Sequence, residues 1–138
     1  MRVPPAAVWD ALADPDAYAF WVVGSKLIRD ADPQWPEPGS KFRHTVGVGP
    51  FTVSDHTKAL ESEPPRRLKI RAKGRPLGTA RVTLEMTPRD GGTLVRMTET
   101  PDGPTALLNL NPVMHFFTKA RNAESLMRLE HLALRRAS

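Results

Sequence analysis

Apolar and charged side chains alternate through much of the chain between residues 40 and 100. In residues 68–73, three apolar side chains alternate with lysine or arginine, and in residues 79–86 apolar side chains alternate with threonine, arginine or glutamate. A period of two places alternate side chains on opposite faces of a β-strand. Turn residues separate these segments, as in residues 89–92 with the sequence Arg-Asp-Gly-Gly. The pattern predicts an antiparallel sheet with one charged face and one apolar face that another element must cover.

The end of the chain is expected to provide that cover. All 14 prolines and all 9 glycines lie at or before residue 112, so residues 112–136 can form one long helix. Asn111 is a suitable cap and Pro112 a suitable first residue. Apolar side chains at helical spacing predict the stripe that faces the sheet. This stripe comprises Val113, Phe116, Phe117, Ala120, Ala123 and Met127.

Two short helices are expected near the N-terminus, over residues 6–14 and 16–21, with the break at the Asp14-Pro15 pair. About six strands, one long helix and two short ones predict an α+β fold. At 138 residues, the chain has room for one core, and we expect a single domain over residues 1–138. The expected strands are residues 22–30, 40–46, 51–61, 68–73, 79–86 and 93–100.

Composition excludes several classes of function. The chain has no cysteine, which removes disulfides, thiolate catalysis and cysteine-based metal sites. Its first residues do not read as a secretory signal, and no segment approaches the roughly 18 apolar residues of a membrane span. We therefore expect a cytoplasmic protein, monomeric or homodimeric, that has no membrane partner. The net charge is +5, but the basic residues are scattered along the chain, which argues against a nucleic-acid partner.

Five segments carry a family resemblance. They are VPPAAVWDALADPDAYAFW at the front, PGSKFRHTVGVGP and ESEPPRRLKIRAKGRP in the middle, and GGTLVRMTE and RNAESLMRL towards the end. In this order they resemble the START-like (SRPBCC) helix-grip superfamily, in its polyketide cyclase/dehydrase-like branch. The resemblance implies a curved sheet wrapped around the C-terminal helix, with a cavity between them for lipids, sterols, polyketides or other apolar molecules. Some members of the family catalyse cyclisation or dehydration in that cavity.

The chain departs from the family pattern at its start. The family has a strand of about six to eight residues before the first helix, whereas only residues 1–3 precede it here. Either the protein begins further upstream, or the sheet lacks most of its first strand. A truncated strand would leave backbone groups of its neighbour exposed, and these groups can pair with another chain.

Polar side chains are predicted on the apolar face of the sheet. Alternation places His44, Asp55, Thr57 and Glu99 there. A two-residue loop in the turn at residues 47–50 would put His44 opposite Val53, and a four-residue loop would put it opposite Asp55. A histidine beside a carboxylate in an apolar cavity can act as a general base or bind the polar end of a ligand. It can also be a hydrogen-bonded pair without a function, and the sequence leaves all three interpretations open.

The candidate catalytic residues are thus His44, Asp55 and Glu99. Trp21 and Trp35 flank loops expected near the mouth of the cavity, which makes them candidates for ligand contact. The predicted ligand-binding residues are Trp21, Phe42, His44, Val46, Val53, Asp55, Thr57, Ile70, Val82, Leu84, Met97, Glu99, Phe116, Phe117, Ala120 and Met127. The four histidines lack the spacing of a zinc motif, and no glycine-rich phosphate loop is present, so we expect no metal and no cofactor.

Three functions follow from these features. The first is binding of a small, mostly apolar molecule in the predicted cavity. The second is a cyclase, aromatase or dehydratase activity that uses His44 with Asp55 or Glu99. The third is a protein–protein regulator that binds no ligand and presents an edge strand or its basic face to a partner. A filled interior would favour the third function over the other two.

Overall fold

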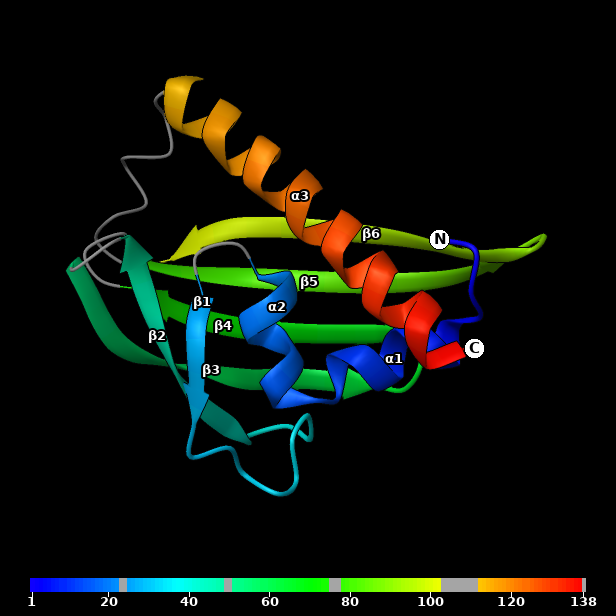
Figure 1. Cartoon of the computed structure of the whole chain (residues 1–138), viewed down its shortest axis with the longest axis horizontal. Coiled ribbons are helices and arrows are strands. Elements are labelled where there is room, and N and C mark those ends of the chain that lie inside the picture. The colour runs from blue at the N-terminus through cyan, green and yellow to red at the C-terminus, as the bar shows by residue number, and fades with distance from the viewer. Residues whose placement is uncertain (23–24, 49–50, 75–77, 103–111, 138) are drawn as a thin grey trace.

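The computed structural model describes residues 1–22, 25–48, 51–74, 78–102 and 112–137 (Figure 1). Its six strands form one antiparallel sheet in the order β1-β2-β3-β4-β5-β6, and the helices lie on one face of that sheet. The predicted α+β architecture is therefore confirmed. In chain order the elements are α1 (Pro5–Leu12), the 3-10 turn η1 (Pro15–Ala17), α2 (Tyr18–Trp21), β1 (Ser25–Arg29), β2 (Lys41–Val48), β3 (Phe51–Glu63), β4 (Arg67–Gly74), β5 (Gly78–Arg89), β6 (Gly92–Asp102) and α3 (Pro112–Ala137).

The predicted alternation decides which face of the sheet is covered. On β4, Leu68 and Ile70 are buried, and on β5, Val82, Leu84 and Met86 are buried. The pairs Leu68–Leu84 and Ile70–Val82 lie directly opposite each other across β4 and β5. Opposed apolar pairs of this kind stabilise a sheet by packing on one face. On β4 and β5, the inner face of the sheet is thus an apolar surface beneath the helices.

The helical layer begins with α1. Proline occupies its first position, where the missing N–H group costs no hydrogen bond. The helix buries Val8, Trp9 and Leu12 and packs against α3 and β5. Asp14 then caps η1, because its Oδ1 accepts a hydrogen bond from the Asp16 nitrogen at 3.1 Å. Short α2 follows directly and lies between β1 and α3.

The long helix begins at Pro112 as predicted, and its predicted cap Asn111 lies outside the described residues. The predicted apolar stripe is wrong for Ala120, Ala123 and Met127, which are exposed; Met127 has 58% of its surface exposed. The buried face instead carries Ser125, Leu129 and Ala133. Helix α3 packs against α1 and α2, so contacts with these helices select a different face. The side chains of Val113, Phe116 and Phe117 lie outside the description.

Residues 1–3 lie along the edge of β6 and are hydrogen-bonded to Thr93. The Met1 nitrogen donates to the Thr93 carbonyl oxygen, and the Thr93 nitrogen donates to the Met1 carbonyl oxygen, both at 2.8 Å. This exchange is the pattern of a hydrogen-bonded pair in an antiparallel ladder. The Thr93 hydroxyl also donates to the Val3 carbonyl oxygen at 2.6 Å, and Val3 is buried. The short segment thus occupies the edge position at which the resemblance places a full strand.

Candidate ligand site

The inner face of the sheet contains two buried polar side chains among apolar ones. His44 on β2 is 7% exposed and Thr57 on β3 is 3% exposed. Phe42, which lies directly opposite Thr57, is fully buried. The rings of Phe42 and His44 are perpendicular, with their centroids 6.1 Å apart. Strands β2 and β3 therefore bring an imidazole and a hydroxyl onto one apolar wall.

The register of β2 and β3 resolves one alternative that the sequence leaves open. His44 lies directly opposite Asp55, and Val46 lies opposite Val53. The predicted link between this register and a four-residue loop is wrong, because β2 ends at Val48 and β3 begins at Phe51, so only two residues, which lie outside the description, separate the paired strands. The backbone register therefore makes the His44 and Asp55 positions direct neighbours across the two strands. The side chain of Asp55 lies outside the description, so its role stays a prediction.

Glu99 is held by α3 through contacts that sequence reasoning missed. Its carboxylate on β6 accepts hydrogen bonds from Arg121 Nη2 at 2.6 and 2.8 Å and from Asn122 Nδ2 at 3.2 Å. The Glu99 side chain is only 13% exposed. Ionic hydrogen bonds to a carboxylate of this kind are stronger than neutral ones. The arrangement ties α3 to β6. Both donors belong to the segment RNAESLMRL, which the sequence analysis used only for the family resemblance.

The other predicted contact residues fall into three groups. Ile70, Val82 and Leu84 are buried in the core, and Met97 is partly buried against it. Ala120 is exposed, and Met127 borders a depression of about 220 Å³ between β6 and α3. Their predicted contact with a ligand stays a prediction. The side chains of a third group lie outside the description, and this group comprises Val46, Val53, Asp55, Phe116 and Phe117.

An aromatic cluster closes the end of the inner wall where β2 begins. Tyr18 contacts the rings of Trp21 and Phe42, each with a centroid separation of 4.9 Å, and Trp35 contacts Phe42 at 4.6 Å. All four side chains are buried. Trp21 and Trp35 therefore pack inside this cluster and are not exposed at loops, and their predicted contact with a ligand stays a prediction. Aromatic rings bury large areas and pack edge to face, which favours a shared cluster over exposure at loops.

Tyr18, which sequence reasoning did not single out, joins α2 to α1. Its hydroxyl donates to the Leu12 carbonyl oxygen at 2.7 Å, and Trp35 Nε1 donates to the same oxygen at 3.1 Å. Burial raises the pKa of Tyr18 well above its usual range, because the charged phenolate would lose its hydration. The hydroxyl therefore stays neutral and keeps its hydrogen bond at physiological pH.

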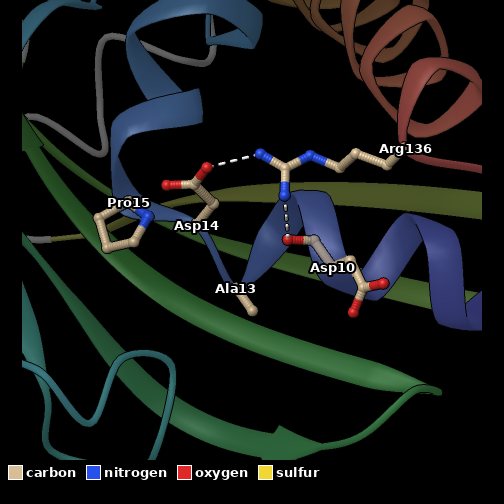
Figure 2. Close-up of a pocket in the computed structure, with 5 residues that line it drawn as sticks. All are labelled: Asp10, Ala13, Asp14, Pro15 and Arg136. Carbon is tan, nitrogen blue, oxygen red and sulfur yellow. Dashed lines mark hydrogen bonds and ion pairs between the residues drawn. The ribbon is translucent and has the colours of Figure 1, made fainter.

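An open depression of about 600 Å³ lies outside this wall, between α1, η1 and the end of α3 (Figure 2). Arg136 crosses it and donates to the Asp10 carbonyl oxygen at 3.3 Å and to Asp14 Oδ2 at 2.5 Å. The guanidinium group thus fastens the end of α3 to the first helices. Its charge is already paired with a carboxylate, so we assign this depression no ligand.

Two features are absent from the described residues. No group of three or more histidine, aspartate or glutamate side chains among them could hold a metal ion. Within the same residues, no helix is long and apolar enough to cross a membrane.

Comparison with known proteins identifies the family. The family model described as "Polyketide cyclase / dehydrase and lipid transport" matches residues 1–133. The chain belongs to this family. No curated protein matches the chain.

Solved structures show that this member of the polyketide cyclase/dehydrase and lipid transport family shares its fold widely. A Nitrosomonas europaea protein is 19% identical with a TM-score of 0.72, and the match covers 98% of this chain and 90% of that chain. A Rhodobacter sphaeroides protein is 22% identical with a TM-score of 0.68, covering 94% and 84%. The protein Ara h 8.0201 is 17% identical with a TM-score of 0.71, covering 96% and 91%. At these identities the similarity establishes the fold alone.

Proposed function

We propose that the protein binds a small, mostly apolar molecule between the inner face of the sheet and α3. The observation that carries the proposal is the burial of His44 and Thr57 within an otherwise apolar wall. Ligand sites typically combine apolar walls with a few placed polar groups that orient the ligand. The family description, which includes lipid transport, supports the same function.

A neutral apolar dye tests this proposal. N-phenyl-1-naphthylamine carries no charge, so the net charge of +5 does not attract it to the surface. We expect a saturable rise in its fluorescence at one equivalent per chain. His44→Ala should weaken dye binding by about fivefold, which corresponds to about 1 kcal/mol for one polar contact.

The matched control is a substitution on the outside of α3. Leu134 is exposed, so Leu134→Lys removes a surface apolar group without reaching the inner wall. We expect this variant to bind the dye as the wild type does. A signal that never saturates, or one that Leu134→Lys lowers as much as His44→Ala does, would refute interior binding. As a separate measurement, native mass spectrometry of the purified wild-type protein would identify any ligand that it retains.

The second candidate function is a dehydratase or cyclase activity, which the register of β2 and β3 favours. His44 opposite Asp55 fits a general base oriented by a carboxylate. Glu99 fits this role less well, because Arg121 and Asn122 occupy its carboxylate. A β-hydroxy ketone such as 4-hydroxy-4-phenylbutan-2-one reports dehydration through the absorbance of its conjugated product. Turnover that survives in His44→Ala would exclude His44 as the base.

A further inference from the structure

The polar groups of the aromatic cluster are satisfied with one exception. The Tyr18 hydroxyl and Trp35 Nε1 both donate to the Leu12 carbonyl oxygen. Trp21 is the most deeply buried tryptophan, with 1% of its surface exposed, and its Nε1 atom is buried as well. Among the residues that the structure describes, no acceptor lies within hydrogen-bonding distance of this nitrogen. One indole N–H group therefore lacks a protein partner inside a cluster whose other donors are paired.

An unpaired buried donor requires an explanation. Leaving such a group without an acceptor costs about 1–3 kcal/mol, and folded proteins rarely retain one. Phenylalanine would preserve most of the ring packing with Tyr18, whose centroid is 4.9 Å away, without burying an N–H group. Retaining tryptophan here is consistent with an acceptor that arrives from outside the chain.

The position of Trp21 connects this donor with the proposed ligand site. Trp21 is the last residue of α2, the helix that lies between β1 and α3. Through Tyr18, its ring belongs to the same cluster as Phe42 on β2. The Phe42 ring in turn contacts His44, the buried imidazole of the inner wall. The unpaired donor is thus linked to the buried imidazole of the proposed site through two ring contacts.

We propose that Trp21 Nε1 donates a hydrogen bond to a carbonyl oxygen of the bound molecule, which makes the ligand an apolar ketone, quinone or lactone. This inference rests on the proposed function. A carbonyl accepts a hydrogen bond without bringing a hydrogen that needs a second buried partner, whereas a hydroxyl group brings one. A carboxylate would bring a charge, and burying a charge beside a neutral donor is unfavourable.

Two matched dyes test the carbonyl specificity. One is 6-propionyl-2-dimethylaminonaphthalene, and the other is its 6-propyl analogue, in which a methylene replaces the carbonyl group. We expect Trp21→Phe to weaken binding of the ketone by about fivefold, as one neutral hydrogen bond predicts, and to leave the propyl analogue unchanged. Trp35→Phe is the matched control, because the Trp35 N–H already donates to Leu12. This control should preserve the affinity ratio of the two dyes.

A spectroscopic readout in the wild-type protein covers the case in which Trp21→Phe fails to fold. In a ¹⁵N-labelled sample, the indole N–H proton of Trp21 should move downfield on saturation with the ketone and stay in place with the propyl analogue. The inference would be overturned if the Trp21 indole resonance did not shift on addition of the ketone, or if Trp21→Phe left the ratio of the ketone and propyl affinities unchanged. Neither result would affect the proposed function. If neither dye bound the wild type, the proposed function itself would fail, and this inference with it.

Discussion

Gly92 at the start of β6 offers a sharp test of how residues 1–3 are held. A Cβ atom on Gly92 would overlap the Met1 carbonyl oxygen and lie 3.0 Å from the Met1 carbonyl carbon and 3.1 Å from the Arg2 Cα. These neighbours are backbone atoms, which cannot turn aside as a flexible side chain can. Gly92→Ala should therefore displace the segment from the edge of the sheet. Gly91, where φ is +79° and a Cβ atom would meet nothing within 4 Å, provides the control.

The magnitude follows from the contacts that would be lost. The two Met1–Thr93 backbone bonds and the Thr93–Val3 bond contribute about 1 kcal/mol each. Burial of the Val3 side chain adds about 2 kcal/mol. Releasing the backbone of three residues returns about 3 kcal/mol of conformational entropy. The net loss is about 2 kcal/mol, or a melting temperature lower by about 7 °C.

Urea denaturation of a double-mutant cycle separates this mechanism from general damage. Thr93→Val removes the hydroxyl that donates to Val3 and should cost about 1 kcal/mol in the wild type. In the Gly92→Ala background it should cost nothing, because that bond is already broken. The Gly91→Ala variant is itself destabilised by about 1 kcal/mol of backbone strain. In that background Thr93→Val should again cost about 1 kcal/mol, as in the wild type. Additive effects of Gly92→Ala and Thr93→Val would refute the reasoning.

Two further predictions concern polar groups beneath the helices. Glu99→Gln should lower the free energy of unfolding by about 1–2 kcal/mol, because Arg121 would lose the partner of a partly buried ion pair. Arg121→Gln should then cost nothing more in chemical denaturation, and an undiminished second loss would contradict the pairing. Tyr18→Phe should cost about 1 kcal/mol at neutral pH through the lost bond to Leu12. Because the pKa of Tyr18 is raised in the folded state, wild-type stability should fall by about 1.4 kcal/mol per pH unit above about pH 10, where the unfolded chain ionises. The variant lacks this contribution, so its deficit should shrink in alkaline melts, and a constant deficit would show that Tyr18 ionises freely.

Much of the sheet was predictable from local pattern. Leu68 and Leu84 face the core because a strand alternates its side chains whatever its partners are. The turn at residues 89–92 joins β5 to β6 because its glycines accept the backbone angles that a hairpin requires, as the φ of +79° at Gly91 shows. The start of α3 at Pro112 follows from the same kind of local preference.

The candidate site was predictable only in part. Alternation placed His44 and Thr57 on the inner wall, where both are buried. It did not indicate that Arg121 and Asn122 would occupy Glu99, because that contact joins β6 to a helix 22 residues further along the chain. Nor did it indicate that Trp21 would be buried without a partner for its N–H group. Contacts of this kind depend on how two elements are placed, which neighbouring residues do not encode.

The sequence by itself therefore determined the elements, their order and the apolar side of the sheet, because these depend on periodicity and turn chemistry within short segments. The tertiary structure alone decided which face of α3 is buried. Leu129 and Ala133 face inward, while Met127 faces out, although all three are apolar residues of the same helix. A helix with apolar residues on more than one side can pack in several rotations. Packing against α1 and α2 selects one of them.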